Sequence, residues 1–118
     1  MGRLVYDSTT SINVDDRALA HLQIVIGAKL RRGESFPFLW KAAESLGGGV
    51  NSLWMAPGIS LHFKYFGSRP PSINYDWLDA LIRTSNSDAG LRLMDELIPS
   101  AHVDGESQDV VTDVVEGV

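Results

Sequence analysis

The alternation of apolar and polar residues predicts six short β-strands along the chain. Two β-type runs at residues 3–6 and 12–14 flank a turn-forming stretch, so they predict an opening hairpin. The alternating run at 35–40 contains Pro37, whose missing backbone N–H favours an edge strand or a bulge. The other predicted strands lie at residues 51–55, 59–66 and 91–94.

The run at 59–66 shows the clearest alternation. Its odd-numbered residues, from Ile59 to Tyr65, are apolar, whereas His62 and Lys64 fall between them. Because successive side chains of a strand point to opposite faces, we expect the apolar set to face the core. His62 and Lys64 are then expected on the other face.

A helix follows the opening hairpin and is well marked at both ends. Asp15 suits the N-cap position, and Val14 and Leu19 occupy the two positions of a hydrophobic staple. Gly33 stands where a helix commonly ends. At 100° per residue, one face of this helix collects the apolar residues Ala18, Leu19, Leu22, Val25, Ile26 and Leu30.

The opposite face of this helix is less usual, because Ala20, Ile24 and Gly27 align there where charged residues would be expected. Two interpretations remain open. Another part of the chain covers these residues, or they form a contact surface for a partner or for a second copy of the chain.

A second helix is predicted from Asn74, with Ile73 and Leu78 repeating the staple pattern, and it ends before Gly90. Its buried face is expected to hold Trp77, Leu78, Leu81 and Ile82. The element order is therefore ββαβββαβ, with mostly short antiparallel connections. This order predicts an α+β fold: a mostly antiparallel, mixed sheet with two helices packed on one face.

Length and charge divide the chain into a body and a tail. The 118 residues suffice for one domain, which we assign to residues 1–98. Residues 1–100 hold ten basic and ten acidic side chains, so the excess of acid lies in the last eighteen residues. We expect residues 99–118 to be a disordered acidic tail. In the alternative interpretation, the valine pairs of this tail dock on a partner as an added strand.

Composition narrows the cellular setting. There is no cysteine, which excludes disulfides and thiolate metal sites and favours a reducing compartment. The stretch MGRLVYDSTT contains no long apolar region of the kind that secretory leaders have, and no run approaches the length that a membrane span needs. We therefore expect a cytoplasmic protein.

Residues that could support catalysis or bind a metal are scarce. The serines lack a Gly-x-Ser-x-Gly elbow, and without cysteine no thiolate nucleophile exists. His21, His62 and His102 have no local partner at metal-ligand spacing. The sequence therefore predicts no catalytic site, no metal site and no cofactor.

The most basic stretch lies at the end of the first helix, where Lys29, Arg31 and Arg32 fall in the last turn. This is the charge order that the helix dipole favours, and it explains these residues without a ligand. Together with Lys64 and Arg69, they are also the candidates for gripping a nucleic-acid backbone.

Four stretches, at residues 15–40, 61–71, 74–81 and 85–96, carry a resemblance. The first stretch contains both of the specific motifs, Asp-Asp-Arg-x-Leu-Ala-His-Leu-Gln and Ala-Lys-Leu-Arg-Arg-Gly-Glu. In these residues the chain resembles a family of small actinobacterial proteins that is treated as a domain of unknown function and often labelled "ATP-dependent DNA ligase". The resemblance implies a shared fold and transfers no catalytic or binding residue.

The residues do not support ligase activity. ATP-dependent ligases attach AMP to the lysine of a Lys-x-Asp-Gly motif, where the lysine is the nucleophile. The single Asp-Gly here is Asp104–Gly105, and His102 stands where the lysine would be required. We therefore predict a non-catalytic protein-interaction module that can self-associate, with a nucleic-acid-binding accessory protein as the alternative.

Overall fold

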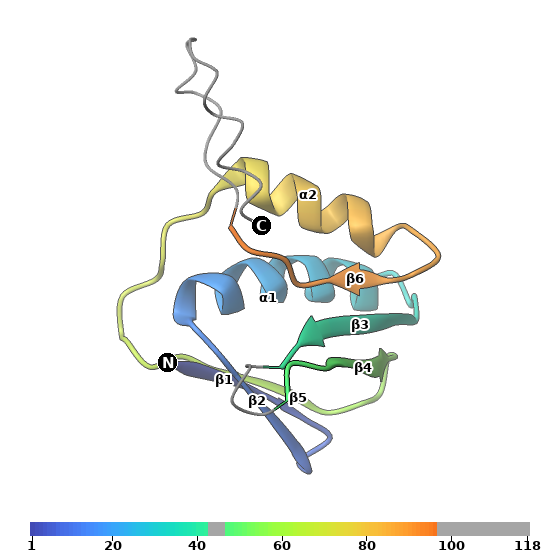
Figure 1. The fold of residues 1–118 in the computed structure, drawn as a ribbon, viewed down its shortest axis with the longest axis horizontal. Coiled ribbons are helices and arrows are strands. Elements are labelled where there is room, and N and C mark those ends of the chain that lie inside the picture. Colours follow the sequence, from blue (N-terminus) through green and yellow to red (C-terminus); the bar gives the residue numbers. More distant parts are fainter. Residues whose placement is uncertain (43–46, 97–118) are drawn as a thin grey trace, which may run out of the picture.

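A computed structural model describes residues 1–42 and 47–96 of the chain. They form two helices and six strands in the order β1 (Gly2–Tyr6), β2 (Thr10–Val14), α1 (Asp16–Arg31), β3 (Phe36–Lys41), β4 (Val50–Met55), β5 (Leu61–Lys64), α2 (Tyr75–Ser85) and β6 (Leu91–Arg92) (Figure 1). The predicted α+β class and element order are confirmed. The acidic tail and the domain boundary predicted at residue 98 lie outside the described residues.

The strands divide into two three-stranded sheets, where the sequence predicted one sheet. One sheet has the order β2-β1-β5, and the other has the order β4-β3-β6 with only the β3–β6 pair parallel. The division falls at the tight turn between β4 and β5, where Gly58 has a φ of +96° and the N–H of Ile59 bonds to the carbonyl of Ala56. Strand β5 then pairs with β1.

Pro37 does not mark an edge strand, so that expectation is wrong. Strand β3 is the central strand of its sheet, and Pro37 lies opposite Trp54 of β4. On the other side, β6 pairs only with Phe38 and Leu39. Pro37 therefore precedes the part of β3 that has a partner on both sides, and the proline interrupts no paired stretch of β6.

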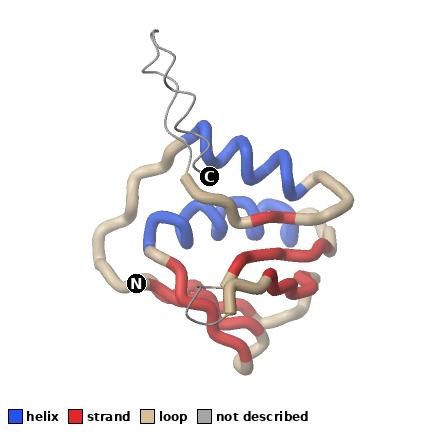
Figure 2. Tube along the Cα trace, in the orientation of Figure 1, coloured by secondary structure: helices blue, strands red, loops and turns tan. Residues whose placement is uncertain are grey.

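Helix α1 is the centre of the fold. It contacts β1 on one side and α2 on the other, and α2 also covers β6 (Figures 1 and 2). This position explains the wide buried face of α1: Ala18, Leu19, His21, Leu22, Val25, Ile26 and Lys29. Both predicted caps form, since the side chain of Asp15 accepts from the N–H of Ala18 and that of Asn74 accepts from the first turn of α2.

Two helical residues differ from their predicted burial. Ile82, which the apolar pattern of α2 places on the buried face, has 38% of its surface exposed. His21, which is not part of the predicted apolar face of α1, is completely buried. Both differences follow from the place of α2, which covers the flank of α1 and leaves its own outer side to solvent.

Candidate interaction site

The second apolar stripe of α1 lies at the protein surface. Ile24 is 44% exposed, and Ala20 and Gly27 are half-buried. A Cβ atom placed on Gly27 would meet no atom within 4 Å, so the space outside this turn is open. Within the described residues, the chain itself therefore covers the stripe only in part.

A segment that leads from β5 to α2, residues 65–73, runs beside this stripe and is fixed to α1 at three points. The carboxylate of Asp16 accepts from the backbone N–H groups of Phe66 (2.9 Å) and Gly67 (2.8 Å). These two hydrogen bonds lower the pKa of Asp16 and keep it anionic. At the other end of the segment, Arg17 donates to the carbonyl (2.9 Å) and hydroxyl (2.8 Å) oxygens of Ser72.

In the third attachment, the hydroxyl of Tyr65 donates to the side-chain oxygen of Gln23 at 2.6 Å. Burial and the neighbouring Asp16 raise the pKa of Tyr65, so the hydroxyl stays protonated and remains a donor. The segment is therefore attached to α1 at both of its ends.

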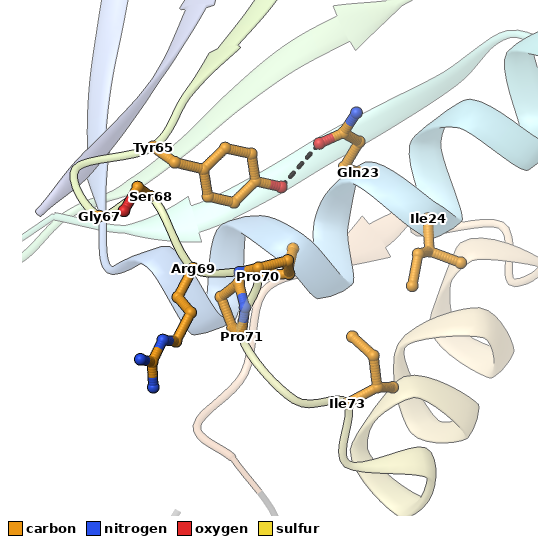
Figure 3. Close-up of a pocket in the computed structure, with 10 residues that line it drawn as sticks. Gln23, Ile24, Tyr65, Gly67, Ser68, Arg69, Pro70, Pro71 and Ile73 are labelled. Carbon is orange, nitrogen blue, oxygen red and sulfur yellow. Dashed lines mark hydrogen bonds between the residues drawn. The ribbon is translucent and has the colours of Figure 1, made fainter.

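The space between helix and segment is a groove of about 570 Å³. Its walls are mainly apolar, and they are formed by Ala20, Gln23, Ile24, Tyr65, Gly67, Ser68, Arg69, Pro70, Pro71 and Ile73. Figure 3 shows Ile24 and Ile73 on opposite walls, with the side chain of Arg69 directed away from them. The structure thus brings Ala20 and Ile24 together in one concave surface, while Gly27 lies outside its lining.

Two buried polar residues, His21 and Asn74, each directly follow a groove-lining residue in the chain. His21 Nδ1 lies 2.7 Å from the carbonyl of Arg17, and Nε2 lies 2.9 Å from the backbone N–H of Asn74. Nδ1 must therefore carry the proton and Nε2 must accept, which fixes the neutral tautomer. The ring also packs on Trp77, with 4.5 Å between centroids. His21 is thus a structural histidine that joins α1 to the start of α2.

Glu96 extends these contacts to the last described residue. It accepts a two-point hydrogen bond from Arg17, with N–O distances of 2.7 to 3.0 Å, and a further bond of 2.9 Å from the side chain of Asn74. The bonds from Arg17 and Asn74 lower the pKa of Glu96 against the opposing effect of its partial burial. No group of three or more potential metal ligands occurs in the described part of the chain.

The basic residues at the end of α1 have different environments. Lys29 is buried, and its ammonium contacts Glu34 (2.9 Å), Asn86 (3.0 Å) and the ring of Phe36 (5.6 Å to the centroid). Arg32 also pairs with Glu34, and both cations together lower the pKa of that carboxyl to about 2. These contacts account for Lys29 and Arg32 without a ligand, and the side chains of Arg31 and Arg32 are both exposed.

The other two nucleic-acid candidates, Lys64 and Arg69, are both exposed but belong to different surfaces. Arg69 lines the groove, whereas Lys64 lies on the outer face of β5. Lys64 is directly opposite Arg3 of β1, a residue that the sequence did not single out. These two cations are 61 positions apart in the chain, and the pairing of β1 with β5 brings them together without any local pattern that signals it.

None of the described helices is both long and apolar enough to cross a membrane. Searches of curated proteins and of solved structures gave no match. A family model matches residues 1–96, which is most of the chain and all of the described elements. This match confirms the predicted kinship with a small domain of unknown function. The chain belongs to the family described as Domain of unknown function, DUF7882.

Proposed function

We propose that this protein is a non-catalytic interaction module and that its partner is a second copy of the same chain, bound along α1 and its groove. The exposure of Ile24 carries the proposal. This branched apolar side chain stands 44% exposed at the rim of an apolar groove, where a solvent-facing helix position would ordinarily be polar.

The layout of α1 favours a second copy over an unrelated partner. Ile24 lies at the midpoint of the helix, which runs from Asp16 to Arg31. A two-fold axis through Ile24 therefore pairs two antiparallel helices over their whole length, as isologous contacts require. In this arrangement Ala20 lies across from Ala28 of the other copy, and these small side chains let the two backbones approach closely.

The helix ends are compatible with the same arrangement. The antiparallel pairing sets the exposed Arg31 of each copy across from Arg17 of the other, whose charge is paired with Glu96. The opposed helix dipoles attract each other and favour the antiparallel direction. The apolar centre would supply most of the affinity.

The lining of the groove favours docking over catalysis. Its polar side chains are Gln23, Tyr65, Ser68 and Arg69, and the first two bond to each other. The lining contains no carboxylate or imidazole that could act as a base toward Ser68. We also propose a cytoplasmic location, on the ground that the chain contains no cysteine.

Sedimentation equilibrium tests the proposal directly. The parent protein should be dimeric at about 100 μM, and Ile24→Glu should yield a folded monomer, because burying two carboxylates against each other is too unfavourable to keep the interface. Ile82→Glu is the matched control: it places the same charge on an isoleucine of similar exposure on α2, and this variant should remain dimeric.

A second variant, Ala28→Arg, guards against a folding defect, since Ala28 is exposed and arginine is a good helix former. Circular dichroism verifies that both variants of α1 are folded. A monomeric parent at 100 μM, or folded α1 variants that stay dimeric, would refute the proposed pairing.

A further inference from the structure

The outer face of the β2-β1-β5 sheet, away from α1, has an unusual charge pattern. The strand register places Arg3 between Asn13 and Lys64, and Val5 between Ser11 and His62. All of these residues except the half-buried Val5 are exposed. None of the residues of the three strands is acidic, although acids and bases balance over residues 1–100. This face is therefore a local concentration of positive charge and neutral hydrogen-bonding groups.

Arg3 and Lys64 form the centre of this face. Side chains directly opposite each other on neighbouring strands lie within about 5 Å at Cβ, and like charges in such a pair repel. Neither residue takes part in the ion pairs found within the described residues. An anion placed between the two side chains would replace this repulsion with two attractive contacts. A phosphate group, which accepts from both arginine and lysine, matches that requirement.

An aromatic side chain lies immediately beside the two cations. Phe66 is 83% exposed, and with Met1, Arg3, Lys64 and Tyr65 it lines a cleft of about 190 Å³. The backbone of Phe66 is fixed by its hydrogen bond to Asp16. That same bond, with the one from Gly67, occupies the carboxylate of Asp16. The backbone of Phe66 is therefore held in place while its ring is exposed to solvent.

We propose that this face binds single-stranded nucleic acid, with a backbone phosphate between Arg3 and Lys64 and a neighbouring base stacked on Phe66. A pair of cations next to an exposed ring is the combination that sequence-tolerant single-strand binding uses. The cleft shares only Tyr65 with the lining of the α1 groove, and the tests of the two proposals use different residues, so nucleic-acid binding can fail while the proposed self-association holds. Acidic lipid headgroups share the phosphate chemistry, but the base gives the flat ring of Phe66 a stacking partner.

Fluorescence anisotropy with labelled twelve-residue oligothymidine and oligouridine tests the proposal. The parent should bind at low salt, and its affinity should fall as salt rises. Arg3→Gln combined with Lys64→Gln should weaken binding and reduce the slope of log K against log salt by about 0.7, since one phosphate lies at this pair and each single-strand phosphate contact contributes about 0.7. This variant should fold, because it removes a repulsion. Phe66→Ser should weaken binding about fivefold or more and leave the slope unchanged.

The matched control is Arg83→Gln combined with Arg92→Gln, which changes the net charge equally on α2 and β6 and should bind as the parent does. Failure of the parent to bind either oligonucleotide at 100 μM protein would overturn the proposal. So would loss of binding in Arg31→Gln with Arg32→Gln but not in the Arg3–Lys64 variant, because the contact would then lie at the end of α1. Cosedimentation with phosphatidylserine vesicles without oligonucleotide binding would reassign the face to membranes.

Discussion

Replacing His21 with leucine tests whether hydrogen bonding or packing holds α2 onto α1. His21 is completely buried, and both ring nitrogens bond to backbone groups at 2.7 and 2.9 Å. Leucine has a similar volume, so the variant removes the two hydrogen bonds with little change in packing. We compare it with His21→Gln, whose side-chain oxygen can still accept from the N–H of Asn74.

The expected magnitude follows from the two contacts. The carbonyl of Arg17 lies inside a helix, where the backbone N–H four residues later also bonds to it, so losing the Nδ1 contact costs about 1 kcal/mol. The buried N–H of Asn74 loses the acceptor that Nε2 provides, which costs about 1–3 kcal/mol. We therefore expect His21→Leu to lower the free energy of unfolding by about 3 kcal/mol, and His21→Gln to lower it by about 1 kcal/mol less.

Urea unfolding followed by circular dichroism measures these free energies. It should be performed at low protein concentration, because self-association stabilises the folded state by mass action. His62→Leu is the control, since His62 is exposed on β5, and it should change stability by less than about 0.5 kcal/mol. Equal unfolding free energies for the leucine and glutamine variants of His21 would refute the reasoning, since they would show that the ring acts through packing alone.

Two further predictions concern glycine and pH. Gly90→Ala should destabilise the protein by about 2–5 kcal/mol, since the φ of Gly90 is +95° and a Cβ there would lie 2.4 Å from Pro37. Gly27→Ala should stabilise it by about 0.5–1 kcal/mol, since Gly27 lies in a helix with open space outside it. Urea unfolding measures both changes, and equal effects of the two variants would contradict the structure. The pKa of Glu34 is lowered from 4.5 to about 2 in the folded state. Ionised Glu34 therefore stabilises the fold fully above about pH 4.5, and this stabilisation is lost progressively as the pH falls toward 2. Between pH 6 and pH 3, the free energy of unfolding should accordingly fall less in Glu34→Gln than in the parent protein.

Local features of the fold could be predicted because local forces determine them. The caps at Asp15 and Asn74, the terminal Gly33 with its φ of +77°, and the alternation along β5 all depend on neighbours a few residues away. The exposure of Ile24 was one of two open interpretations, because its cover depends on where a distant segment runs. The structure places residues 65–73 beside it, and they shield it only in part.

The pairing of β5 with β1 is the step that the sequence could not supply, and both proposed surfaces depend on it. It sets Lys64 opposite Arg3, and a shift of one residue in register would turn one of the two toward the core. It also ends β5 beside the first turn of α1, at the far side of the molecule from its junction with β4 (Figure 1). Residues 65–73 then cross the N-terminal half of α1 to reach the start of α2 at Tyr75, and this crossing forms the outer wall of the groove. The sequences of β1, β4 and β5 show only ordinary alternation, which does not specify a partner strand. The pairing of β5 with β1 is therefore determined by the packing of the whole core around α1. A chain that folded with β5 on β4 would keep every local signal in this sequence and would have neither surface.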